Sequence, residues 1–77
     1  MKIKIKYFGM LTEVTNCEAE IIDFSGVLIS DLLEMLFIKY SDLKDKKFRV
    51  AQNNELVSVN TKITSKEIVL LPPFSGG

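Results

Sequence analysis

Residues 68–77 read "IVLLPPFSGG", and this stretch decides the fold. Ile68 to Leu71 is a continuous run of apolar β-formers. Such a run is typical of a central strand that is covered on both faces, or on one face and by a partner. Pro72 and Pro73 end the strand because proline cannot donate to a β-ladder. The preceding residues must therefore supply the neighbouring strands and a covering layer.

The N-terminal part of the chain predicts two of those strands. Residues 2–8 alternate, so that Ile3, Ile5 and Tyr7 point one way and three lysines point the other, which predicts a strand with one buried face. A turn is expected at Gly9 and over residues 12–16. Weaker alternation over residues 17–24 predicts a second strand, paired with the first as a hairpin.

The middle of the chain changes from strand to helix periodicity. Apolar residues recur at i, i+3, i+4, i+7 and i+11 from Ile29, which predicts an amphipathic helix over about residues 29–40. Phe37 and Ile38 are expected to widen its buried stripe. The start is weakly signalled, since either Ser30 caps the helix or it begins at Leu28, which has no capping oxygen.

The remaining elements complete an α+β domain. Short strands are expected over residues 48–51 and 55–59, joined by an Asn-containing turn at 52–54. The resulting order is strand, strand, helix, strand, strand, strand. It fits the ubiquitin-like β-grasp fold, a mixed sheet of about five strands packed on one main helix, with the last strand parallel to the first in the sheet centre. The prediction is one domain over residues 1–77, with a flexible C-terminal tail at 72–77.

One shared core between sheet and helix follows from these patterns. Its predicted members are Ile3, Ile5, Tyr7, Ile29, Leu32, Leu33, Leu36, Val50 and Leu70.

Composition argues against several classes of function. Lys+Arg and Asp+Glu number 10 each, so there is no cationic excess to bind nucleic acid. The alternating N-terminus lacks a signal-peptide core, and no run approaches the roughly 20 apolar residues of a membrane span. We therefore expect a soluble cytoplasmic domain with neither nucleic acid nor membrane as a partner.

The chain has few of the residue types that commonly act in catalysis. The chain has no histidine, the commonest general base, and its single cysteine cannot form an internal disulfide or a cysteine-built metal site. Cys17 lies in a strand pattern, where a small buried hydrophobe is expected rather than a reactive thiol. The mixed-charge run at 42–47 is expected to be a solvated loop. No metal site and no bound cofactor are predicted.

The tail is the exception. Residues 68–77 carry no charged side chain, and Phe74 offers an aromatic anchor for a partner pocket. The two prolines stiffen the exit and reduce the entropy that docking removes. Gly76 and Gly77 have no β-carbon, so their backbone can enter a narrow channel. Such a tail suits delivery of a terminal acyl group into another protein's active site.

The closing segment "ITSKEIVLLPPFSGG" resembles that of the small subunit of molybdopterin synthase, the sulfur carrier of molybdenum-cofactor synthesis. The segments "IKYFGMLTE", "ISDLLEML" and "FRVAQNNELV" resemble its first strand and turn, its helix and its third strand. Thr64-Ser65-Lys66 departs from the usual Asp-Gly-Asp turn of the family. Leu28 stands where a capping threonine is common.

The resemblance implies a mechanism carried out on partner proteins. A ubiquitin-activating-type adenylyltransferase would use ATP to adenylate the Gly77 carboxylate, and a sulfur donor would convert it to a thiocarboxylate. The large subunit, expected to form a heterotetramer with this chain, would then accept the tail and its sulfur. Gly77 would carry the sulfur and Gly76 would be the steric gate. The expected partner-binding residues are Phe8, Leu71, Pro72, Pro73, Phe74 and Ser75.

Three other interpretations remain open. The sulfur carrier of thiamine thiazole synthesis shares the fold and the Gly-Gly end, but its usual tail lacks the Pro-Pro-aromatic exit. A ubiquitin-like modifier would join the same carboxylate to lysines of other proteins. A plain interaction domain with an adhesive tail is the alternative without chemistry.

Overall fold

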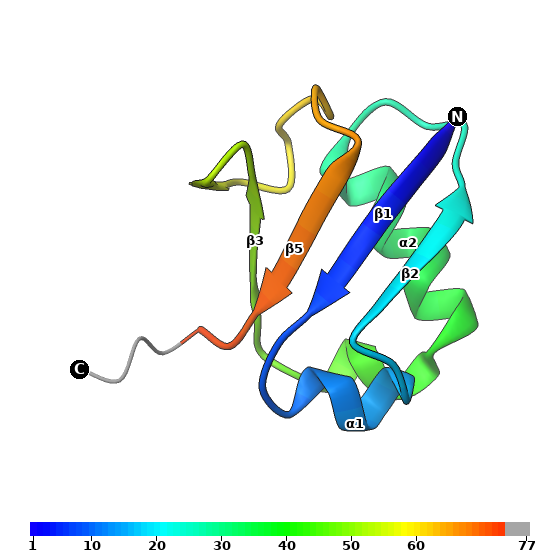
Figure 1. Ribbon diagram of the computed structural model, residues 1–77, viewed down its shortest axis with the longest axis vertical. Helices are drawn as coiled ribbons and strands as arrows, with labels where there is room; N and C mark the ends of the chain where they lie inside the picture. Colours follow the sequence, from blue (N-terminus) through cyan, green and yellow to red (C-terminus); the bar gives the residue numbers. More distant parts are fainter. Residues whose placement is uncertain (74–77) are drawn as a thin grey trace.

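The computed structural model describes residues 1–73, which form a five-stranded mixed sheet (Figure 1). The spatial order of the strands is β2-β1-β5-β3-β4. β1 and β5 run parallel at the centre, while the other neighbours are antiparallel. The predicted β-grasp arrangement is confirmed, including the last strand beside the first. The strand bounds are β1 Lys2–Tyr7, β2 Ala19–Asp23, β3 Arg49–Gln52, β4 Glu55–Val57 and β5 Glu67–Leu71.

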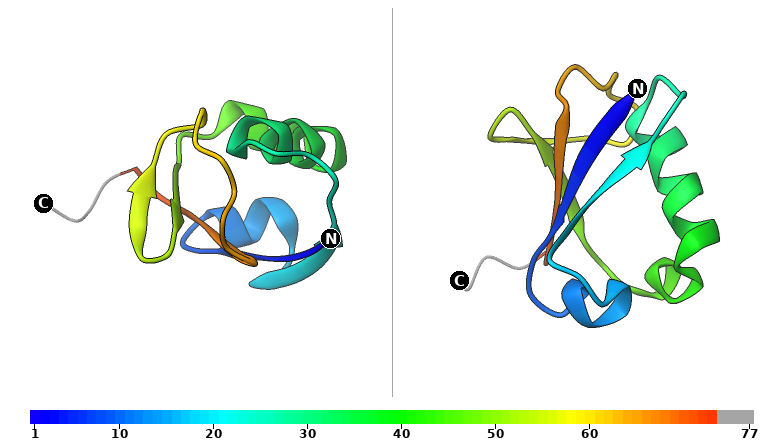
Figure 2. Two further views of the ribbon diagram at one scale, coloured as in Figure 1. Left: turned by 90° about the horizontal axis from the view of Figure 1, so that it is seen from above. Right: turned by 45° about the vertical axis from the view of Figure 1, so that its right-hand side comes forward.

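The helix α2, Ile29–Lys39, covers one face of this sheet (Figure 2). All nine predicted core residues are buried between the two layers. The last strand is a continuous apolar run because both of its faces are at least partly covered. Ile68 and Leu70 face the core, whereas Val69 and Leu71 are half-buried on the other face. The buried hydrophobic core also includes Leu11, Ile22, Phe24, Leu43 and Ile68.

The start of α2 lies at Leu28, which supplies no side-chain cap. Instead, the Asp31 carboxylate turns back and accepts hydrogen bonds from the backbone N–H groups of Leu28, at 2.9 Å, and Val27, at 3.1 Å. These bonds lower the pKa of Asp31. The carboxylate thus makes the half of a capping box that serves the N-cap amide, while the N–H groups of Ile29 and Ser30 donate to the carbonyls of Thr61 and Val59.

Three local predictions are wrong, two of them at helices α1 and α2. A short helix, α1 at Leu11–Thr15, replaces the turn expected over residues 12–16, because Leu11 is fully buried and pins the segment to the core. Its left-handed exit is at Asn16, where φ is 60°. Ile38 does not widen the buried stripe of α2 but is 86% exposed, since it lies about 200° around the helix from Leu36.

The charged run after α2 also contains structure. A 3₁₀ helix, η1 at Ser41–Asp45, replaces the expected loop, and its central Leu43 is fully buried. The charged neighbours of Leu43 remain exposed, as predicted. Cys17 is half-buried and packs against the core, outside the bounds of β2. The turn at Asn53 and Asn54 is confirmed, with φ values of 54° and 63°.

Within residues 1–73, no helix is both long enough and apolar enough to cross a membrane. The same part of the chain contains no group of three or more His, Cys, Asp or Glu side chains placed to hold a metal ion.

Candidate functional site: the tail exit and its flanking grooves

The C-terminal segment leaves the domain from the middle of the sheet. Leu71 pairs with Arg49 at the end of the β3–β5 ladder, and the Phe8 N–H donates to the Leu70 carbonyl at 3.0 Å on the other side. Pro72 is half-buried and Pro73 is exposed. The exit is therefore anchored in the core on two sides. Phe74, Ser75, Gly76 and Gly77 lie outside the described residues, so their predicted roles stay predictions.

Beside the exit, the sheet face that α2 leaves open carries a depression of about 590 Å³, lined by both apolar and polar residues and here called the outer groove. Phe8 is 49% exposed there, and Leu71 lines the same groove. Both were predicted as partner-binding residues, and the fold brings them together. The other apolar lining residues are Ala51, Leu56 and Val69.

Leu56 is the most exposed of the apolar outer-groove residues that the sequence analysis did not single out. It is 52% exposed, although leucine in a strand is usually covered. The hairpin register places it opposite Ala51, which in turn pairs with Val69 on β5. Alternation could have revealed it: Val57 is half-buried toward the core side, so its neighbour must face outward.

Polar residues line the outer groove alongside the apolar ones. Lys6 and Glu67 form an ion pair at 3.5 Å along its edge, with side chains that are about half exposed. Such an exposed pair adds little stability. Apolar residues ringed by polar side chains are instead typical of a protein interaction surface.

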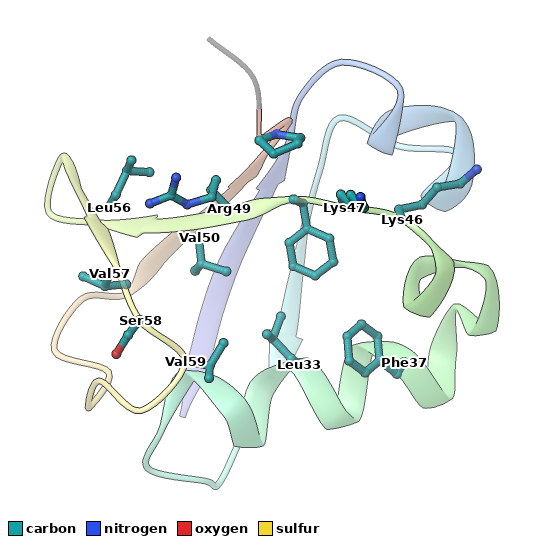
Figure 3. A pocket seen from close by; sticks show the side chains of 12 residues that line it. Leu33, Phe37, Lys46, Lys47, Arg49, Val50, Leu56, Val57, Ser58 and Val59 are labelled. Atoms are coloured by element: carbon teal, nitrogen blue, oxygen red, sulfur yellow. The ribbon is translucent and has the colours of Figure 1, made fainter.

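A second depression, of about 610 Å³, lies on the other side of the exit, between α2 and the β3–β4 hairpin. Figure 3 shows Leu33 and Phe37 of α2 facing Val50 and Val59 across it. Lys46, Lys47 and Arg49 stand around its rim, and Pro73 also lines it. The tail therefore begins between two depressions, and the second of them joins an apolar lining to a cationic rim.

The most perturbed titratable groups lie away from both grooves. Burial, and next a hydrogen bond to Glu20, raise the pKa of Tyr7 and of Tyr40 far above the usual phenol value. These phenols stay protonated at neutral pH and act as hydrogen-bond donors inside the fold. Among residues 1–73, the charged residues that line the outer groove are Lys6 and Glu67. The described surface thus suits docking better than proton transfer.

Fold and exit together define a class, the ubiquitin-like β-grasp proteins that present a C-terminal segment beside an apolar sheet face. Within it, this chain belongs to the ThiS family, whose model matches residues 5–77. It is a ubiquitin-like protein of the sulfur-carrier type.

Solved structures share the fold over nearly the whole chain. A protein from Pyrococcus furiosus described as subunit 1 of a molybdopterin converting factor is 21% identical, with a TM-score of 0.86 and coverage of 96% of this chain and 99% of its own. Small archaeal modifier protein 1 of Haloferax volcanii is 21% identical, with a TM-score of 0.80 and coverage of 95% and 98%.

A third structure is of a complex. It contains subunits 1 and 2 of the molybdopterin-converting factor from Helicobacter pylori, and the matching chain is 25% identical. The TM-score is 0.69, and the match covers 100% of this chain and 100% of the matching chain.

Proposed function

We propose that this sulfur carrier is the small subunit of molybdopterin synthase and that it carries sulfur as a thiocarboxylate at Gly77. The observation that carries the proposal is the junction of β5 with the tail. The central strand holds Leu70 fully buried, and three residues later Pro73 is in solvent. A chain that leaves a rigid core so abruptly can be inserted into a partner while the domain docks outside.

The outer groove is the proposed docking surface for the large subunit. Phe8 and Leu56 provide apolar area that is already exposed, half-buried Leu71 lies in the same groove, and the sheet holds this surface in place. Anchors fixed before binding lose little conformational entropy on association. The Helicobacter pylori structure, in which subunits 1 and 2 form a complex, supports a larger partner for a chain of this kind.

The proposed chemistry is activation followed by sulfur exchange. On the activating enzyme, a Gly77 carboxylate oxygen attacks the α-phosphorus of ATP and pyrophosphate leaves, so that an acyl adenylate forms. A donor at the oxidation level of sulfide then attacks the acyl carbon, and AMP leaves with the carbon–oxygen bond broken. Adenylation is needed because oxide is a poor leaving group and AMP is a good one. This chain contributes reach and positioning, while the partners supply the acids and bases.

Co-expression with the activating enzyme and intact-mass spectrometry tests the carrier step. The expected product has a mass gain equal to the difference between one sulfur and one oxygen atom, located by fragmentation at Gly77. Covalent attachment to lysines of other proteins would favour the ubiquitin-like modifier instead. Unmodified protein under conditions that load a known carrier would reject both.

To distinguish molybdopterin synthesis from thiazole synthesis, the experiment must include the protein and substrate that accept the sulfur. Thiocarboxylated chain is mixed either with the large subunit and the molybdopterin precursor or with a thiazole synthase and its substrates. Dithiolene formation in the first mixture alone supports the proposal. Thiazole formation in the second alone contradicts it while leaving the carrier step intact.

A further inference from the structure

The base of the tail lies against a glycine in a different part of the chain. In the parallel register Tyr7 is opposite Leu70, so two steps further along each strand bring Gly9 beside Pro72. A β-carbon built on Gly9 would lie 2.7 Å from Cγ and 3.5 Å from Cδ of Pro72. The shorter separation is below any normal carbon–carbon contact, so the proline ring occupies space that only glycine leaves open.

Gly9 is itself firmly held. Its φ is +60°, a conformation that glycine adopts without strain. Its carbonyl accepts hydrogen bonds from the Thr12 hydroxyl, at 2.9 Å, and from the Thr12 N–H, at 3.2 Å. The next turn is anchored by Leu11, whose side chain is fully buried. The connection between β1 and α1 is thus a fixed platform.

Pro72 stands where the β-ladder stops holding the chain. Leu71 is the last residue of β5 paired with β3, and within residues 1–73 the Phe8 N–H to Leu70 carbonyl bond is the last backbone hydrogen bond on the β1 side. Proline has no N–H to extend either ladder. At Pro72, the close approach to Gly9 limits the space open to the proline ring. Figure 1 shows the β1–α1 connection and the exit of β5 at the same end of the sheet.

We propose that Gly9 is a positioning residue, which acts through Pro72 to aim the tail at the partner's reaction centre. This inference rests on the proposed function in assuming that the tail is delivered to such a centre. Five residues follow Pro72, and in extended form they span roughly 17 Å. A deflection of about 15° at Pro72 would move their end by about 4 Å. Even a ~1 Å error can cost about a hundredfold in rate.

The direction of the tail can be measured without any sulfur chemistry. A spin label at Ser75→Cys, in a Cys17→Ala background, broadens the NMR signals of whatever part of the domain the tail visits. The test variant is Gly9→Asn, because asparagine tolerates positive φ and so leaves the β-carbon contact with Pro72 as the main change. We expect the broadened residues to change in Gly9→Asn. They should return toward the wild-type set when Pro72→Ala removes the clashing Cγ.

Gly26→Ala is the matched control. A β-carbon there would meet Phe24 at 2.5 Å and Asp31 at 2.7 Å, so the variant is equally crowded, but it lies in the connection between β2 and α2. It should lower stability without altering the broadening pattern. If Gly9→Asn unfolds the domain, Thr12→Val removes the hydroxyl bond to Gly9 without adding bulk and should shift the pattern in the same sense.

Kinetics of dithiolene formation by the large subunit, with thiocarboxylated chain as the substrate, give the second readout. Gly9→Asn should lower kcat about tenfold or more, while KM stays within about twofold because the outer groove is unchanged. An unchanged broadening pattern, or an equal loss of kcat in Gly26→Ala, would overturn the positioning role. If the wild-type chain forms no thiocarboxylate, the proposed function fails, and the broadening pattern still decides whether Gly9 aims the tail.

Discussion

The Tyr7 hydroxyl donates a 2.7 Å hydrogen bond to the Glu20 carboxylate and thereby ties β1 to β2 through their side chains. Tyr40, just beyond α2, donates to the same oxygen at 2.7 Å, and the Lys39 ammonium donates to the other oxygen. The two tyrosine rings meet edge to face, with centroids 6.3 Å apart. One carboxylate thus joins the N-terminal hairpin to the end of the main helix.

This cluster predicts acid sensitivity. Burial alone would raise the pKa of Glu20, but the hydrogen bonds from Lys39, Tyr7 and Tyr40 outweigh it and lower that pKa below its ordinary value of 4.5. Folding therefore favours the ionised form. Its contribution to stability is present above about pH 4.5, the unfolded value, and is lost as pH falls through the lower folded value. Glu20→Gln should cost about 1–3 kcal/mol at pH 7, and urea unfolding at pH 7 and pH 3 measures it.

The control for that measurement is Glu18→Gln, at an exposed carboxylate two residues earlier. It should change stability little at either pH. A cost for Glu20→Gln that is the same at pH 3 as at pH 7 would contradict the role of the ionised carboxylate.

Two residues of α2 test the helix register. Leu33 is 7% exposed and packs in the core, whereas Ile38 is 86% exposed. Leu33→Ala should lower the free energy of unfolding by about 2–5 kcal/mol. Ile38→Ala should change it by less than about half a kcal/mol. Similar costs for the two variants in denaturant titrations would show that the register is wrong.

Apolar residues at period 2 and at period 3.6 were sufficient to predict the sheet and the helix that covers it, because an element buried on one face must carry apolar residues at that spacing. Ile3, Ile5 and Leu70 were correctly placed for that reason. The short helix α1 was missed because five residues are too few to show a period. Its existence depends on Leu11 reaching a core that only the assembled fold creates.

Only part of the candidate site could be predicted from the sequence. Phe8 and Leu71 could be linked to the tail because each is apolar and adjacent in sequence to a break in structure. Leu56 belongs to an ordinary strand pattern, and only the sheet order brings it to the same face. The contact between Gly9 and Pro72 joins positions 63 residues apart (72 minus 9), so it requires the parallel pairing of β1 with β5.

Leu56 should contribute to binding of the large subunit. Leu56→Ala removes exposed apolar area from the outer groove, so it should weaken the complex by about 1–2 kcal/mol while changing stability little. Ile38→Ala, on the opposite side of the molecule from that sheet face, is the matched control and should bind like wild type. Isothermal titration with purified large subunit measures both. Unchanged affinity for Leu56→Ala would exclude the outer groove from the interface.

Phe74 is predicted to be the aromatic anchor of the tail. Phe74→Ala should weaken complex formation by at least about 1 kcal/mol, as expected for the loss of a buried aromatic contact. Thermal stability should stay at the wild-type value, because the tail is predicted to contribute little to the core. Equal affinity of variant and wild type in a titration would remove Phe74 from the anchors, even if the outer-groove variants bind weakly.

The last prediction concerns the tip. Deleting Gly77, or adding one residue after it, should abolish sulfur transfer, because one residue moves the reacting carbon by about 3.3 Å. Gly76→Val should also fail, since a β-branched side chain stiffens the backbone and fills a channel sized for glycine. Circular dichroism and thermal stability should match wild type in all three variants. The assay is dithiolene formation by purified large subunit after preactivation of each chain.

Ser75→Ala is the control for the tip, because it alters the same segment while keeping its length and the two terminal glycines. It should retain most of the activity if reach and backbone width are what the tail provides. Mass spectrometry before the assay separates the two steps: a variant that gains sulfur but does not transfer it fails in the large subunit, and one that gains none fails at activation. Full activity from the chain without Gly77 would reject the carrier mechanism and favour an adhesive tail.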